Sequence, residues 1–173
     1  MEMDRISFEI KARCVNPATI RKILRSRKAS FKGLDRQIDT YFYVPSGRLK
    51  LREGKIEKAL IYYKRINQRN SKRCDAFLWK CSDLNAIKKI LELAWGILVV
   101  VDKQREIYFL GNVKFHIDRV KRLGNFVEIE AQGRAGKTSP AKLKDQCEFY
   151  QNLFGIRPRD LLADSYSDQI LRF

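Results

Sequence analysis

Apolar and polar residues alternate strictly in several short runs along the chain. Ile6–Cys14 is the first such run, and Arg48–Glu53 and Val113–Val120 repeat its pattern. A period of two sends alternate side chains to opposite faces of a strand, so each run predicts a β-strand with one apolar face. The same reasoning, with β-preferring residues, predicts strands over residues 37–43, 59–66, 75–80, 97–101, 105–110 and 125–132. Residues 67–73 are polar and cationic and predict a loop.

Helix signals stand between groups of these strands. Asn16 is a predicted N-cap, followed by Pro17 at the first helical position. Ser82 is the predicted cap of a second helix that stops at Gly96, and Ser139 precedes a third. A short helical tail is expected from residue 158 onward.

The helices do not follow every strand, so a regular βαβ alternation is absent. That excludes a doubly wound parallel sheet and favours an α+β fold with a mainly antiparallel sheet. The length of 173 residues fits a single domain over residues 1–173. No glycine-rich phosphate-binding loop of either common type occurs.

The chain is strongly basic. Its formal net charge is +16 and its isoelectric point is near 9.9, so it needs an anionic partner: nucleic acid, an acidic membrane surface or a phosphorylated small molecule. Four cysteines form no CxxC pair and His116 is the sole histidine, which excludes a zinc finger. The longest apolar run, Ile97–Val101, is too short to span a bilayer, so no membrane segment is expected. Dispersed cysteines without a signal peptide predict a cytoplasmic protein.

Charged residues of one sign recur two positions apart, on one face of a predicted strand. A single such row fits a solvated sheet face, but recurrence on several strands favours a barrel closed with the charged face inward. Arginine and lysine in a cationic lumen suit a polyphosphate, and carboxylates suit Mg²⁺ or Mn²⁺. The cationic residues of the rows are Lys11, Arg13, Arg48, Lys50, Arg52, Lys103 and Arg105, and the acidic ones are Glu9, Asp118, Glu128 and Glu130.

These residues lie within motifs that resemble the CYTH family, the triphosphate tunnel metalloenzymes. The C-terminal segment resembles the class IV adenylyl cyclase-like branch of that family. Each motif is weak alone, and the motifs are specific through their order and spacing. The resemblance spans nearly the whole chain. Its motifs are Glu9–Arg13, Asp39–Phe42, Gly47–Glu53, Lys64, Asp102–Arg105, His116–Val120, Leu123–Glu130 and Leu161–Asp168.

The resemblance implies an eight-stranded antiparallel β-barrel, forming a triphosphate tunnel with helices packed around it. It implies Mg²⁺ or Mn²⁺ held by Glu9, Asp118, Glu128 and Glu130. Lys11, Tyr41 and Arg52 are the expected catalytic residues, with Tyr41 placed near Lys11 for proton transfer. The expected substrate-binding residues are Lys11, Arg13, Lys50, Arg52, Lys64, Lys103 and Arg105.

The reaction stays open between two chemistries. A class IV adenylyl cyclase-like enzyme would convert ATP to cyclic AMP and pyrophosphate, and a triphosphatase would hydrolyse tripolyphosphate or a thiamine or nucleoside triphosphate. A barrel that binds without turnover is a further alternative. A nucleic-acid-binding protein is less favoured, because the basic stretch is explained at least as well by a solvated loop. A homodimer also stays open.

Two further residues, Ser7 and His116, bear on the composition of the expected site. Ser7 stands where the family signature has its first glutamate, so one metal position is expected to be weaker, unless Ser7 belongs to a frayed strand end. His116 is expected to be structural, since a lone histidine beside a strand turn is more often a core residue than a ligand.

Overall fold

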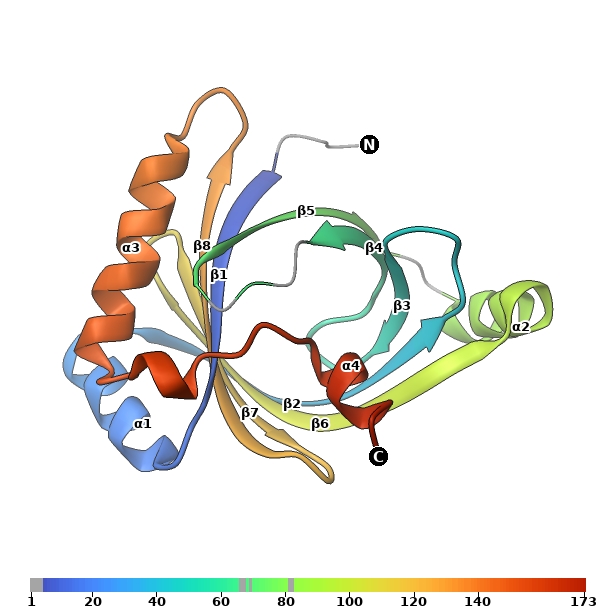
Figure 1. Ribbon diagram of the computed structural model, residues 1–173, viewed down its shortest axis with the longest axis horizontal. Coiled ribbons are helices and arrows are strands. Elements are labelled where there is room, and N and C mark those ends of the chain that lie inside the picture. The colour runs from blue at the N-terminus through green and yellow to red at the C-terminus, as the bar shows by residue number, and fades with distance from the viewer. Residues whose placement is uncertain (1–4, 66–67, 69, 81–82) are drawn as a thin grey trace.

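The computed structural model describes residues 5–65, 68, 70–80 and 83–173. Over these ranges the chain forms eight strands that close into one antiparallel barrel (Figure 1). Around the barrel the strand order is β1-β5-β4-β3-β2-β6-β7-β8. The strands are β1 (Arg5–Arg13), β2 (Ser30–Phe42), β3 (Arg48–Glu53), β4 (Ala59–Arg65), β5 (Lys72–Trp79), β6 (Ile97–Leu110), β7 (Val113–Val120) and β8 (Gly124–Arg134).

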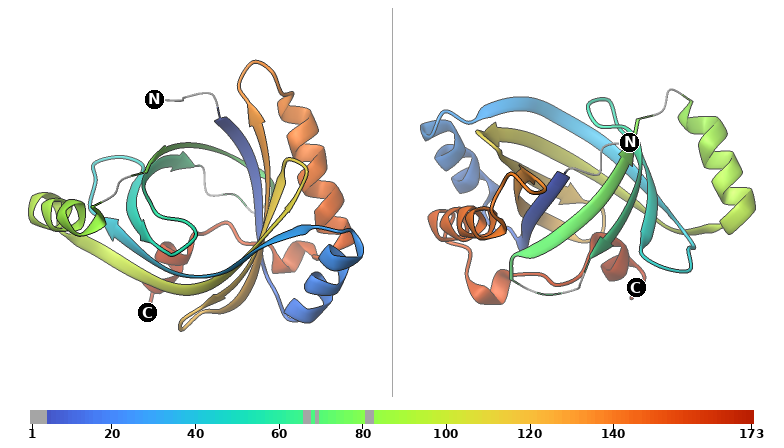
Figure 2. Two further views of the ribbon diagram at one scale, coloured as in Figure 1. Left: turned by 180° about the vertical axis from the view of Figure 1, so that it is seen from behind. Right: turned by 90° about the horizontal axis from the view of Figure 1, so that it is seen from above.

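Two helices cover the outer face of the barrel near its closing seam. β1 closes the barrel against β8 along nine registered residue pairs, from Arg5↔Arg134 to Arg13↔Phe126. Helices α1 (Pro17–Ser26) and α3 (Pro140–Leu153) lie beside this seam, as Figure 2 shows from behind. Their apolar faces join the largest hydrophobic cluster, which includes Leu24, Phe115 and Leu143. This largest cluster therefore lies against the outer face of the barrel, outside the lumen.

The remaining helical elements lie elsewhere on the barrel. Helix α2 (Leu84–Trp95) packs through half-buried residues on a small cluster around Phe42 and Leu51, on the side away from α3. After a 3₁₀ turn (Pro158–Asp160), the C-terminal segment crosses one end of the barrel and ends in α4 (Tyr166–Ile170).

The fold expected from the sequence is confirmed, with local corrections. Residues 97–101 and 105–110 belong to one continuous strand, β6, whereas two strands were expected. β5 begins at Lys72, inside the segment expected to be a loop. The cap of α2 is Asp83, whose carboxylate accepts from the Ala86 amide; the expected cap, Ser82, lies outside the described residues. The expected cap Asn16 does accept from the amides of Ala18 and Thr19.

None of the helices in the described ranges has the length and apolar character needed to cross a membrane.

Candidate functional site

Strand alternation turns one row of side chains from each strand into the barrel. The lumen is a cavity of about 780 Å³, within the range of about 300–1,000 Å³ found for small-molecule sites. Most of the charged residues predicted from sequence line this cavity, which supports the inward-facing barrel. They are Glu9, Lys11, Lys50, Arg52, Lys103, Arg105, Glu128 and Glu130, and Tyr41 joins them.

Three predicted site residues are not among the side chains that line the cavity. Lys64 is exposed, because β4 turns Ala59, Ile61 and Tyr63 inward and its even-numbered residues outward. Arg13 is exposed at the end of β1, with its guanidinium 5.6 Å from the Phe126 ring centre. The expectation that Lys64 and Arg13 lie in the tunnel is therefore wrong.

Asp118 is the third of these residues. Its two carboxylate oxygens accept from Arg105 at 2.7 and 2.6 Å, and the Tyr166 hydroxyl donates to one of them at 2.8 Å. Burial would raise the pKa of Asp118, but Arg105 lowers it to about 2. Asp118 thus lies behind the cavity wall and orients Arg105. Because both of its oxygens are already engaged there, Asp118 does not fit the role of metal ligand expected from the sequence.

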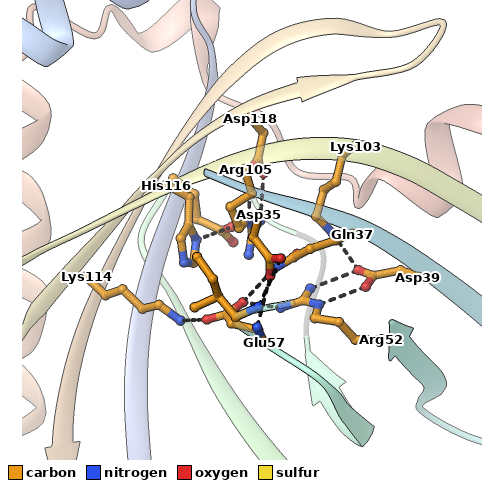
Figure 3. A network of polar contacts seen from close by, with 12 residues as sticks. Asp35, Gln37, Asp39, Arg52, Glu57, Lys103, Arg105, Lys114, His116 and Asp118 are labelled. Atoms are coloured by element: carbon orange, nitrogen blue, oxygen red, sulfur yellow. Dashed lines mark hydrogen bonds and ion pairs between the residues drawn. The ribbon is translucent and has the colours of Figure 1, made fainter. Parts of the chain in front are cut away.

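A single carboxylate holds three cations in the lumen. Asp39 accepts from Arg52 at 2.8 Å through both oxygens and from Lys103 at 2.6 Å (Figure 3). It also accepts from Lys50 at 3.0 Å. Burial would raise the pKa of Asp39, but Arg52, Lys103 and Lys50 hold it well below its usual range. Burial also lowers the pKa of Lys103, reinforced by Arg52 and Arg105 against the effect of Asp39. The cluster carries more positive than negative charge and would be stabilised by a further anion.

A second carboxylate enters the lumen from the turn between β3 and β4. Glu57 accepts from Arg52 at 3.0 Å and from Gln37 at 2.9 Å, and it is paired with Lys114. Asp35 shapes the turn by accepting from the amides of residues 55, 56 and 57. Gly54 is required there, because a Cβ would lie 2.5 Å from an Asp35 carboxylate oxygen. The turn thus fixes Glu57 between Arg52 and Lys114 in the lumen.

The C-terminal segment forms another part of the cavity wall, through Ser165 and Tyr166. Leu162 donates its amide to the Lys11 carbonyl at 2.8 Å, and Lys72 donates to the carbonyls of Leu162 and Ala163 at 3.1 Å. Arg48 reaches the Asp168 carboxylate at 2.8 Å. These bonds hold Tyr166 in the cavity wall. Its position depends on contacts with distant strands, so no pattern within residues 161–168 would predict it.

The tyrosine against Lys11 is Tyr166, whose ring centre lies 3.9 Å from the lysine nitrogen. Tyr41, which was expected beside Lys11, instead accepts from Lys50 at 3.4 Å. Burial, with Asp39 nearby, raises the pKa of Tyr41 to about 12. Tyr41 is therefore protonated at neutral pH and could donate a hydrogen bond, but it is a poor base.

His116 lies in the lumen, although the sequence analysis left it out of the site. Its Nδ1 is 3.1 Å from Glu128, while its buried Nε2 has no hydrogen-bond partner among the described residues. Burial, with Arg105 and Lys114 nearby, lowers the pKa of His116 to about 4, so the ring is neutral at pH 7. Because Glu128 can only accept, Nδ1 carries the proton, and the buried Nε2 lone pair has no partner among the described residues.

Glu9, Glu128 and Glu130 form an acidic group on the neighbouring strands β1 and β8. Glu9 and Glu130 are registered partners, and Glu128 is opposite Lys11. Burial, with the charges of Glu128 and Glu9, raises the pKa of Glu130 although Lys114 opposes the shift. A divalent cation would relieve this repulsion, so the carboxylates suit one by their chemistry. In their present positions, no three acidic, histidine or cysteine side chains of the described residues group closely enough to hold a metal ion.

The chain resembles several solved structures over nearly its whole length. PH1012 from Pyrococcus horikoshii OT3 is 28% identical, with a TM-score of 0.78 over 94% of this chain and 98% of that one. A Vibrio parahaemolyticus protein provisionally described as an adenylate cyclase has a TM-score of 0.78 at 19% identity, covering 97% and 98%. HpAC1 from Hippeastrum, an adenylyl cyclase candidate described as having a dominant triphosphatase activity, has 0.64 at 11% identity, covering 97% and 95%.

At 19% and 11% identity, the last two structures bear on the fold alone. No protein of curated function matches the sequence. Residues 5–165 match the CYTH domain, and this range contains both the barrel and the acidic and cationic groups described above. The protein is therefore a member of the CYTH domain family.

Proposed function

We propose that the protein binds a triphosphate and a divalent metal in its tunnel and cleaves the phosphate chain. The observation that carries this proposal is the cluster of Lys50, Arg52 and Lys103 around the single carboxylate of Asp39. Such a cluster has hydrogen-bond donors to spare and a shortage of negative charge, which are the properties of a polyphosphate site.

The reaction that we favour is the class IV adenylyl cyclase-like one, from ATP to cyclic AMP and pyrophosphate. Arg52 and Lys50 would bind phosphate oxygens and stabilise the negative charge that builds on them. Lys11 of β1, beside Tyr166, would contact the phosphate chain as well. Bound Mg²⁺ or Mn²⁺, held by Glu9, Glu128 and Glu130, would neutralise further charge on the phosphates.

Hydrolysis of the triphosphate is the second candidate, and His116 favours it. Its ring lines the cavity and is neutral, and its buried Nε2 has no partner among the described residues and could accept a hydrogen bond from a water molecule. The description of HpAC1 agrees with hydrolysis by this fold.

Product analysis tests the proposal. The protein is incubated with ATP, and separately with tripolyphosphate, in Mg²⁺ or Mn²⁺, and cyclic AMP, pyrophosphate and orthophosphate are resolved. Cyclic AMP with pyrophosphate supports the cyclase, and orthophosphate supports the hydrolase. If the protein binds neither ATP nor tripolyphosphate, the proposed function is wrong.

We expect Lys50→Ala to weaken triphosphate binding by about 1.5–3 kcal/mol, since it removes a charge-assisted hydrogen bond. Arg52→Ala should have an effect of similar size. Calorimetric titration with tripolyphosphate measures both, and Lys64→Ala is the matched control because Lys64 points away from the lumen. Equal losses in Lys50→Ala and Lys64→Ala would show that the tunnel is not where the phosphates bind.

We expect Ser7→Glu to lower the metal concentration needed for half-maximal activity. Ser7 lines the cavity two residues before Glu9, and it is registered with Gln132 on β8 and Cys74 on β5, so it is not a frayed strand end. A glutamate there adds a carboxylate beside the acidic group. The test is a Mg²⁺ titration of activity alongside the apparent affinity for triphosphate, which should change less. An unchanged metal titration would place residue 7 outside the coordination sphere.

A further inference from the structure

The wall of the tunnel formed by β4 and β5 differs in chemistry from the rest. Its inward side chains are small or apolar, and two cross-strand pairs, Ile61↔Leu78 and Tyr63↔Ala76, form its centre. No acidic or basic side chain of the described residues 59–65 and 72–79 lines the cavity, although Lys58 and Lys80, just beyond these strands, do so. The lining residues of this wall are Ala59, Ile61, Tyr63, Cys74, Ala76 and Leu78.

Cationic side chains both border the apolar wall and face it across the lumen. Next to β4, strand β3 contributes Lys50 and Arg52, and Lys50 is the registered partner of Ile61. In the strand order of the barrel, β4 and β5 lie farthest from β6 and β7, and Figure 1 shows these pairs on opposite sides of the opening. β6 and β7 contribute Lys103, Arg105 and Lys114 to the lining. A molecule that filled the cavity would therefore meet ammonium and guanidinium groups from β3, β6 and β7 and hydrocarbon from β4 and β5.

Part of the apolar wall is not covered by protein. Leu78 is 56% exposed although its side chain lines the cavity, and Ile56, at the edge of this wall, is 44% exposed. A bare triphosphate cannot use this surface, since phosphate oxygens gain nothing from contact with hydrocarbon. The cavity, at about 780 Å³, also has room for a group beyond the phosphate chain.

We propose that the β4–β5 wall is the subsite for the organic group of the substrate, which makes the substrate an organic triphosphate whose organic group presents apolar surface to this wall. This inference rests on the proposed function, and it holds for a cyclase and a hydrolase alike. It excludes inorganic tripolyphosphate as the preferred substrate. The phosphate chain contacts the Lys50–Arg52–Lys103 cluster, and the organic group packs on Ile61 and Leu78.

The experiment compares ATP, thiamine triphosphate and tripolyphosphate. Dissociation constants are measured by calorimetry in excess chelator, where metal-dependent turnover cannot consume the ligand, and kcat/KM is measured with Mg²⁺. At least one organic triphosphate should bind more tightly than tripolyphosphate. Leu78→Ser should weaken that binding about three- to tenfold, the worth of part of a leucine side chain buried by the ligand. Tripolyphosphate binding should not change.

Trp79→Ser is the matched control, because Trp79 is the next residue of β5, is 59% exposed and is not among the lining residues. Leu78 is itself largely exposed, so Leu78→Ser should fold normally. The inference is overturned if tripolyphosphate binds as tightly as both organic compounds, or if Leu78→Ser behaves like Trp79→Ser. If none of the three compounds binds, the proposed function fails instead.

Discussion

Asp39→Asn should lower the free energy of unfolding of the ligand-free protein by about 3–5 kcal/mol, the usual cost of removing one partner from a buried ion pair. The change leaves Lys50, Arg52 and Lys103 together without their shared counter-ion. Lys103 can lose its proton more easily than a free lysine, and this limits the cost. Urea denaturation measures the effect.

Added tripolyphosphate should restore much of the lost stability, because it supplies the missing negative charge to the folded state alone. The control is Asp102→Asn, on the outer side of β6. Asp102 pairs with Arg36, which is 73% exposed, at 3.4 Å, and such a pair contributes about 0–1 kcal/mol. If the two variants lose equal stability, Asp39 does not hold the cluster together.

The same carboxylate predicts a dependence on pH. Its pKa in the folded protein is lower than the value of about 3.9 in the unfolded chain. Its contribution to stability is therefore complete above roughly pH 5 and is lost as the pH falls through the folded-state value. Asp39→Asn should have a shallower loss of stability in acid than the wild type.

Strand periodicity was sufficient to predict most of the lumen. Lys50 and Arg52 are two residues apart, and so are Lys103 and Arg105. Each pair therefore shares one face of its strand, and both members point into the lumen once that face is known to be the inner one. The same rule could have identified Asp39, which shares its face with Tyr41, but Asp39 was noted only as part of a family motif and was given no role. Lys64 was misplaced because it was assigned from the family resemblance alone, whereas the inward residues Ile61 and Tyr63 turn it outward.

Residues outside the strands could not be placed in this way. Glu57 enters the lumen because Asp35, about twenty residues earlier, binds the backbone of its turn. Tyr166 does so because the C-terminal segment is bonded to β1 and β5. Both positions depend on contacts between distant segments, which no local period encodes. β6 was divided in two because Asp102, Lys103 and Gln104 are polar on both faces, and strand alternation disappears there.

Glu130→Gln should weaken Mn²⁺ binding by at least about 100-fold, since loss of a residue that only supports a metal ligand already costs 10–100-fold. The reason lies in the acidic group, where burial and the charges of Glu128 and Glu9 raise the pKa of Glu130. A bound cation favours the ionised carboxylate, so affinity should rise with pH through that pKa, and binding should release protons. Glutamine keeps the shape of the side chain but not its charge.

Electron paramagnetic resonance of free Mn²⁺ measures binding directly and does not depend on activity. Glu148→Gln is the control, because Glu148 lies on the exposed face of α3, where it pairs only weakly with Lys144 at 3.7 Å. Glu130→Gln should also bind Mn²⁺ with less proton release than the wild type, a difference that a purely structural role would not produce. Wild-type affinity in Glu130→Gln would remove Glu130 from the coordination sphere, and the cation would then have to be held by Glu9, Glu128 and the phosphates of the substrate.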